Sequence, residues 1–304
     1  MILDNIEFIK GYSLVKDLGV GYSKTPKFVI LLDGKQLFVK ISPFEIPQNL
    51  PDLLRNVPHA PILDIGKVGD NFYIVEEYLD APTLKDVVYD LDENIMFDFG
   101  YKMGTAYSSL RNKFPDRLIS CEELNYLKKK VYISVEDLQS LFSDDTPKQV
   151  VDFSLEVIDY LLKNIDVFKN ATMVFGNTDI KPNNFVYIDN NVFAVDYDYT
   201  DYAFVPYALN FCLSAYRFEN TKKYQSFASG YIAGLFGKTV PDKFDNHMDY
   251  MFVLVCARYM IKYLERKDYK RAISFVKFVK DKYIVDGKLE VFSNLEIIKN
   301  TYKK

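Results

Sequence analysis

The chain has 304 residues, of which 49% are hydrophobic and 16% are aromatic, so it can bury a large core and should not be disordered. Its net charge of −4 argues against a nucleic-acid-binding protein, and no apolar run is long enough to span a membrane. Three widely spaced Cys and an N-terminus without a signal-peptide pattern favour a cytoplasmic protein.

Residues 1–80 predict a small antiparallel sheet. Asp33–Gly34 and Gly69–Asp70 each separate two apolar runs, which is typical of tight hairpins because the central turn residues need positive φ. Pro51 suits the first turn of a short helix between the third and fourth strands. Five strands are expected, from the runs YSLVKDL, KFVILL, QLFVKI, PILDIGKV and FYIVEEYL.

Residues 81–304 predict a larger, mainly helical lobe. Apolar spacing over 83–170 is helical, with a loop-and-helix insertion at about 113–147, and the pattern is helical again from about 206. Between them lies a short hairpin, FVYI and VFAVD, joined by a turn at Asp189–Asn191. The predicted class is therefore α+β, with one domain at 1–80 and a second at 81–304.

Polar side chains flank that hairpin, in the stretches FGNTDIKPNN and DYD. Phosphoryl transfer from a nucleotide needs a carboxylate at the attacking hydroxyl, hard oxygen ligands for Mg²⁺ and cations near the phosphates. Asp179 can be that carboxylate, and Asn184 and Asp196 can supply the metal-binding oxygens. Lys181 can face the transferred group. Lys40, in the third predicted strand, can reach the other phosphates, although a lysine there is also typical of a protected sheet edge.

These stretches resemble motifs of the aminoglycoside phosphotransferase/choline kinase family, which has a bilobal protein-kinase-like fold. NTDIKPNN and VFAVDYD are similar to its catalytic and metal-binding loops, FVKI to its nucleotide-binding strand, and EEYLDAPTL to the hinge between its lobes. The resemblance implies that Asp179 is the catalytic base and that Asn184 and Asp196 hold Mg²⁺. It implies a set of nucleotide-binding residues: Lys40, Gly19 and Gly21 of GVGY, and Glu77, Tyr78 and Leu79 of the hinge.

The sequence also departs from the family pattern. Asn177 and Thr178 replace the His and Gly that precede the catalytic Asp in the family, which leaves a pseudokinase open as an alternative. No acidic residue is an obvious partner for Lys40; Asp52 is the preferred candidate and Glu45 the second.

The expected function is a phosphotransferase that moves the γ-phosphate of ATP or GTP to a hydroxyl of a small molecule. Only about ten residues separate Asp196 from the helix expected near Pro206, which is short for a peptide-binding activation segment. An atypical protein kinase and a scaffold without nucleotide binding remain alternatives, and the oligomeric state is open. Acidic residues would suit a cationic acceptor such as an amino sugar or choline: Asp198, Asp201 and Glu219.

His59 and His247 lie in no arrangement with Ser, Cys or carboxylates that suggests a triad or a zinc site. Both are predicted to be structural. Cys212 and Cys256 lie in apolar runs and are predicted to be small core residues.

Overall fold

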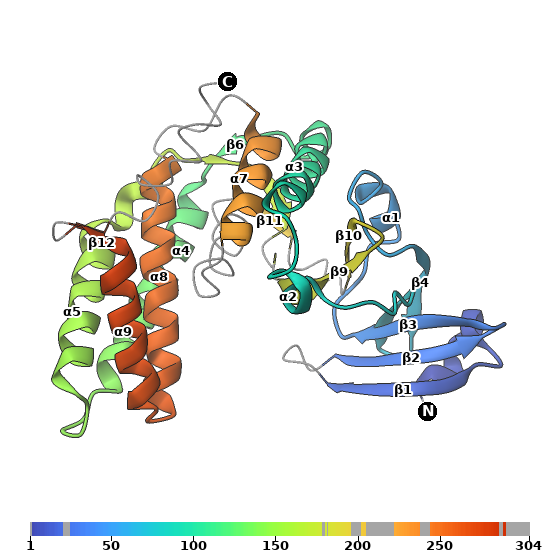
Figure 1. Cartoon of the computed structure of the whole chain (residues 1–304), viewed down its shortest axis with the longest axis horizontal. Helices are drawn as coiled ribbons and strands as arrows, with labels where there is room; N and C mark the ends of the chain where they lie inside the picture. The colour runs from blue at the N-terminus through green and yellow to red at the C-terminus, as the bar shows by residue number, and fades with distance from the viewer. Residues whose placement is uncertain are drawn as a thin grey trace. The chain divides into compact units, whose positions relative to one another are not determined.

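The computed structural model describes residues 2–20, 25–177, 180, 182–195, 202–204, 222–237, 244–285 and 288–289. Contacts divide the chain into two compact units, each assembled from segments that are distant in sequence (Figure 1). Unit 1 comprises residues 1–110, 179–202 and 221–235, and unit 2 comprises residues 111–178, 203–220 and 236–304. The lobe boundary expected near residue 80 stays a prediction.

Unit 1 begins with a five-stranded antiparallel sheet in the order β1-β2-β3-β5-β4 (Figure 1). Asp33 and Gly34 have φ of 50° and 77°, so they form the predicted two-residue hairpin turn. A four-residue helix, α1, lies between β3 and β4 with a proline in its first turn, also as predicted. The bounds are β1 Ser13–Val20, β2 Pro26–Leu32, β3 Lys35–Ser42, α1 Leu50–Leu53, β4 Ile62–Val68 and β5 Asn71–Glu77.

One face of this sheet is closed by the N-terminal segment. Two 3₁₀ helices, η1 (Ile2–Asn5) and η2 (Glu7–Ile9), bury Leu3 and Ile9. These pack with side chains that alternate along the strands: Phe28 and Ile30 of β2, Leu37, Val39 and Ile41 of β3, and Tyr73 and Val75 of β5. Because neighbouring strand residues point to opposite faces, the residues between them face the other way.

Unit 1 also contains two helices that approach each other unusually closely, α3 (Glu93–Ser109) and α7 (Lys222–Phe236). A Cβ atom added to Gly100 or Gly104 of α3 would clash with the backbone of α7. The same substitution at Gly230 or Gly234 of α7 would clash with the backbone of α3. The remaining elements of unit 1 are α2 Leu84–Val87, η5 Pro182–Asn184, β9 Phe185–Ile188 and β10 Asn191–Ala194.

Unit 2 is mainly helical. Within it α8 packs against α4 and α5, and α9 packs against α5 and α8. Its helices are α4 Cys121–Ser140, α5 Lys148–Lys163, α8 Phe244–Glu265 and α9 Tyr269–Tyr283, with 3₁₀ turns η3 Leu110–Asn112 and η4 Ile165–Phe168. Its short strands are β6 Arg117–Leu118, β7 Thr172–Met173, β8 Phe175–Asn177, β11 Tyr202–Phe204, β12 Ile284–Val285 and β13 Lys288–Leu289.

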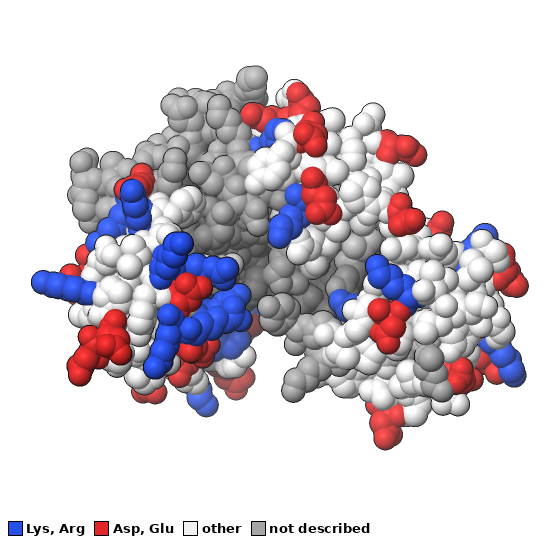
Figure 2. Space-filling model, turned by 60° about the horizontal axis from the view of Figure 1, so that its bottom comes forward, with Lys and Arg blue, Asp and Glu red and all other residues white. Residues whose placement is uncertain are grey.

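The structure confirms the predicted α+β class, a five-stranded antiparallel sheet followed by a mainly helical region. Cys256 is buried as predicted, whereas Cys212 lies outside the described residues. In Figure 2 the Lys and Arg side chains that gather on one face of the molecule are interspersed with Asp and Glu, as on solvated helix surfaces. Among the described residues, no helix is both long and apolar enough to cross a membrane.

Candidate functional site

A cavity of about 270 Å³ in unit 1 lies where the sheet meets the segment that follows β5. We call it the connector pocket, and residues 77–83 the connector. Its walls come from the free face of the sheet, from the connector and from the two ends of the β9–β10 hairpin. The lining residues are Leu18, Lys27, Phe38, Ala60, Glu76, Glu77, Tyr78, Leu79, Ala81, Thr83, Val186 and Val195.

Hydrogen bonds hold the connector extended along the sheet. The backbone N–H of Glu77 donates to Pro61 O (2.9 Å), and that of Tyr78 donates to Gln36 O (3.1 Å). The backbone N–H of Leu79 has no hydrogen-bond partner among the described residues, so it can serve a ligand in the pocket. Glu77, Tyr78 and Leu79, which the resemblance predicts to bind the nucleotide, all line this pocket.

The β9–β10 hairpin is fastened to both sides of the pocket. Ala60 N–H donates to Ala194 O (3.1 Å), which ties β10 to the segment before β4. Tyr187 N–H donates to Pro82 O (3.1 Å), which ties β9 to the connector. The hairpin turn is formed by Asp189 and Asn190, with φ of 49° and 62°, so the predicted tight turn is confirmed.

At the base of this hairpin, Val195 N–H donates to the carbonyl oxygen of Asn184 over 2.8 Å. The bond places Asn184 beside the residue that directly precedes position 196 in the chain. Several predicted site residues lie outside the described residues: Asp179, Lys181 and Asp196 of the catalytic and metal positions, Gly21 of the phosphate loop, and Asp198, Asp201 and Glu219 of the acceptor site.

Lys40 lies on β3, and its side chain is only 3% exposed. The strand has β2 on one side and β5 on the other, so the alternative role of Lys40 in protecting a sheet edge does not apply. Its register partners are Lys27 on β2 and Ile74 on β5. Lys40 therefore lies on the face of the sheet opposite the buried cluster, where a cation can serve a ligand.

The carboxylates predicted to pair with Lys40 lie elsewhere. Asp52 accepts a hydrogen bond from Arg55 at 2.7 Å, and both side chains are exposed. Leu50 and Leu54 are buried, and Asp52 is two residues from each, so it falls on the outer face of this short helix. Glu45 is exposed. Neither carboxylate forms an ion pair or hydrogen bond with Lys40 in the structure.

Glu76 is a carboxylate that lines the connector pocket and is only 1% exposed, and it was not predicted from the sequence. It lies opposite Phe38 of β3, and so shares a face with Lys40, two residues further along that strand. The available signal was alternation: Tyr73 and Val75 face the buried cluster, so Glu76 between Val75 and the connector has to face the opposite side of the sheet.

Lys27 was also not predicted to lie at this site. The two-residue turn at Asp33–Gly34 fixes the β2–β3 register, so counting outward from the turn pairs Lys27 with Lys40. Gly19 of the expected phosphate loop lies opposite Lys27, with φ of 75°. The N–H of Gly19 donates to the side chain of Asp17 (2.8 Å), so this amide is engaged within the strand.

Both histidines lie against backbone carbonyl oxygens, and their structural role stays a prediction. The ring Nδ1 of His59 lies 2.5 Å from Ala60 O, and burial lowers the pKa of His59, which keeps the ring neutral. His247 is buried in unit 2, where its Nε2 lies 3.0 Å from Val167 O and its ring packs against Phe168.

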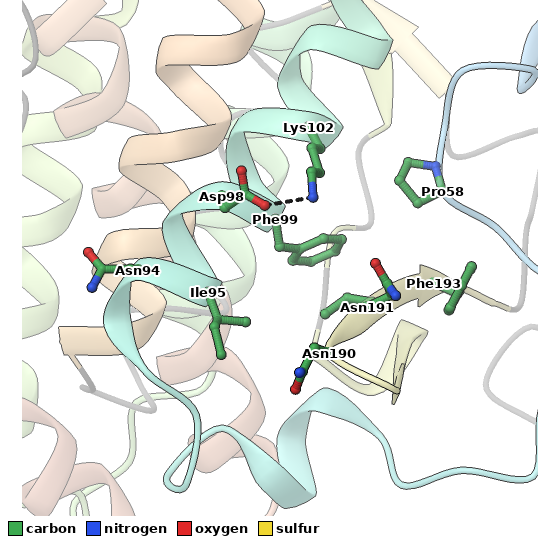
Figure 3. A pocket seen from close by; sticks show the side chains of 10 residues that line it. Pro58, Asn94, Ile95, Asp98, Phe99, Lys102, Asn190, Asn191 and Phe193 are labelled. Atoms are coloured by element: carbon green, nitrogen blue, oxygen red, sulfur yellow. Dashed lines mark ion pairs between the residues drawn. The ribbon is translucent and has the colours of Figure 1, made fainter.

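A second cavity in unit 1, of about 300 Å³, lies between the first half of α3 and the turn of the β9–β10 hairpin (Figure 3). Its polar groups are exposed asparagines and the ion pair between Asp98 and Lys102, which are one helical turn apart and 2.7 Å from each other (Figure 3). Such a solvated pair contributes little binding energy. The connector pocket, which is lined by the buried carboxylate of Glu76, is therefore the better candidate site.

No protein-family model and no curated protein matches this chain. Solved structures do match. The apo form of a thermostable mutant of aminoglycoside phosphotransferase APH(4)-Ia is similar with a TM-score of 0.59 and 12% identity, over 91% of this chain and 95% of that chain. Spectinomycin phosphotransferase APH(9)-Ia, in complex with ADP and spectinomycin, gives a TM-score of 0.52 and 13% identity, over 96% and 93%.

A third match is the gentamicin complex of APH(2″)-IIa, with a TM-score of 0.54 and 14% identity, over 95% of this chain and 96% of that chain. The chain therefore has the protein-kinase-like fold of the aminoglycoside phosphotransferases, at low sequence identity. The fold expected from the motifs is confirmed.

Proposed function

We propose that this protein is a Mg²⁺-dependent phosphotransferase that moves the γ-phosphate of ATP or GTP to a hydroxyl group of a small molecule. The observation that carries the proposal is the connector pocket, where the connector backbone with the N–H of Leu79 lies beside the sheet face that carries Lys40. The purine of a nucleotide would lie against the connector backbone, and the phosphates of the nucleotide would extend toward Lys40.

The residues around the hairpin base suit a divalent cation. Asn184 offers an amide oxygen and Asp196 a carboxylate, which are the hard ligands that Mg²⁺ prefers. The hydrogen bond from Val195 to Asn184 supports their joint assignment, because it joins the two chain segments that carry them. When bound, Mg²⁺ supplies charge neutralisation at the phosphate oxygens.

The remaining roles follow from the motif. Asp179 accepts or orients the proton of the attacking hydroxyl, and Lys181 places a cation at the transferred group. Asp198, Asp201 and Glu219 are proposed to attract a cationic acceptor, such as an amino sugar or choline. The similarity to phosphotransferases whose structures were solved in complex with spectinomycin and with gentamicin favours a small-molecule acceptor over a protein.

A melting experiment with ATP, GTP and Mg²⁺ tests nucleotide binding, since a ligand at 100 times its dissociation constant adds about 2.7 kcal/mol to folded-state stability. Phosphoryl transfer is then measured for wild type and Asp179→Asn, with amino sugars and choline as acceptors. We expect Asp179→Asn to keep the nucleotide-dependent stabilisation and to transfer about 10²- to 10⁴-fold more slowly.

Asn177 in place of the family His favours a pseudokinase as the second candidate. Nucleotide-dependent stabilisation with equal, negligible turnover in wild type and Asp179→Asn would establish that alternative. A mass gain of one phosphoryl group on the protein itself would instead indicate an atypical protein kinase. If neither nucleotide stabilises the protein, the remaining alternative is a scaffold that does not bind nucleotides.

A further inference from the structure

Lys27 of β2 and Lys40 of β3 are directly opposite each other in the antiparallel pair. Residues in such a position point to the same face of the sheet, with Cβ atoms about 4.5–5.5 Å apart, and like charges there destabilise the sheet. Neither strand is at an edge, because the order is β1-β2-β3-β5-β4. Protection of an exposed edge therefore does not explain the two lysines.

The two lysines lie on the face of the sheet opposite the buried cluster, which is the face that lines the connector pocket. We call it the ligand face. Lys27 lines the connector pocket and is half-buried, and Lys40 is almost fully buried. Two lysine side chains that leave the sheet side by side can reach oxygens of one polyphosphate, each as a strongly hydrogen-bonding point charge.

The charge distribution of the pocket also favours one orientation of a bound nucleotide. Glu76 lies at the connector end of β5, opposite Phe38 of β3. Lys40 lies two residues beyond Phe38 on β3, and Lys27 lies opposite Lys40 on β2. A carboxylate repels phosphates and two ammonium groups attract them. The phosphates are thus directed away from the connector and toward the row formed by Lys40, Lys27 and Gly19.

Within this row, the backbone N–H of Gly19 already donates to the side chain of Asp17, so this amide does not serve a phosphate. At the position of Gly19, phosphate binding then falls to neighbouring side-chain cations. Lys27 is the described lysine that both lines the pocket and lies beside Lys40.

We propose that Lys27 is a second phosphate-binding residue, which holds the polyphosphate of a nucleotide together with Lys40. The proposal rests on the nucleotide-dependent function proposed above. It assigns to Lys27 the binding of the phosphates and no role in recognising the purine.

The test is calorimetric titration of the full chain, with Mg²⁺ present, against adenosine, ADP and ATP and the matching guanine series. The variants are Lys27→Gln, which removes the charge, and Lys27→Arg, which keeps it. Lys35→Gln is the matched control, because Lys35 is an exposed lysine in the same sheet, at the opposite end of β3. A melting curve of each variant verifies that it is folded.

We expect Lys27→Gln to weaken ATP binding about 10- to 100-fold, the value of one hydrogen bond to a charged group, and to leave nucleoside binding unchanged. Lys27→Arg should retain most of the affinity for ATP, and Lys35→Gln all of it. Unchanged ATP affinity in Lys27→Gln overturns the proposal, and so does an equal loss for nucleoside and triphosphate, which indicates a structural role. If the wild-type protein binds none of these ligands, both the proposed function and the role of Lys27 are wrong. If the wild-type protein binds ATP and transfers its phosphoryl group while Lys27→Gln does so equally well, only the role of Lys27 is wrong.

Discussion

Asn184 and Val195 are joined by a backbone hydrogen bond of 2.8 Å, although a complete two-stranded hairpin separates them in sequence. The hairpin therefore acts as a spacer that returns the chain to its starting point. Its geometry determines how far apart the residues on either side of it can lie, and these include the two proposed metal ligands.

The turn of this hairpin should be sensitive to side-chain shape. Asn190 has φ of 62°, and its side chain accepts a hydrogen bond from Tyr187 at 2.7 Å. Asn190→Val places a β-branched residue in the left-handed region, so we expect a loss of about 1–2 kcal/mol in the free energy of unfolding. Asn190→Gly should lose less, and denaturant unfolding of both variants makes the comparison. Equal losses would contradict a backbone origin of the effect.

The contact between α3 and α7 should tolerate no added methyl group. Gly104→Ala introduces a clash with the backbone of Tyr231 and Leu235, and overpacking of this kind costs about 1–3 kcal/mol. The loss is expected even though alanine favours helices over glycine by about 1 kcal/mol. Thermal unfolding measures it, with Lys102→Ala on the exposed side of α3 as the control. A higher melting temperature for Gly104→Ala than for wild type would show that α3 and α7 lie further apart than the structure places them.

Nucleotide binding should depend on Lys40 and be independent of Asp52. Lys40→Met removes a buried cation from the ligand face, so ATP should bind at least about tenfold more weakly. Asp52→Asn should bind ATP as wild type does, because Asp52 pairs with Arg55 on the surface. Equilibrium titration of both variants with ATP is the measurement. A comparable loss in both variants would restore Asp52 as the partner of Lys40.

The pair of Arg117 and Glu123 predicts a local pH dependence of stability in unit 2. Hydrogen bonds from Arg117, at 2.5 and 2.6 Å, lower the pKa of Glu123 from 4.5 to about 2. A carboxyl group whose pKa is lower in the folded state stabilises the fold above its unfolded pKa, and this contribution disappears as the pH falls from about 4.5 through about 2.

Both side chains are more than a third exposed, so the stabilisation should not exceed about 1 kcal/mol. Unfolding of wild type and Glu123→Gln should differ at pH 7 and converge near pH 2. Glu122→Gln removes a neighbouring exposed carboxylate and controls for net charge. A difference that persists unchanged at low pH would assign the effect to the helix cap that Glu123 forms with Ser120.

Much of the sheet was predictable because its signals are local. A turn such as Asp33–Gly34 depends on the φ preferences of two residues, and it then fixes the register of both strands. The order β3-β5-β4, by contrast, requires β5 to pair with a strand from which α1 and β4 separate it in sequence. Apolar alternation identifies such strands without identifying their neighbours.

The motif residues of the connector were predicted and do line one pocket, whereas the buried carboxylate beside them was missed. Glu76 and Glu77 are adjacent and identical in sequence, so only the side of the sheet on which each one lies distinguishes them. That side is decided by what covers the sheet, here Leu3 and Ile9 of the N-terminal segment.

The sequence by itself determined the strands, the tight turns, the longer helices and the spacing of the polar motif, because each depends on the conformational preferences of neighbouring residues. Only the tertiary structure decided which face of the sheet the N-terminal segment covers, and so on which side Lys27 and Lys40 lie. It alone also decided that Asp52 points outward and that four glycines bring α3 against α7. These features depend on contacts between segments far apart in the chain, where the free energy of burial, and not local propensity, selects the arrangement.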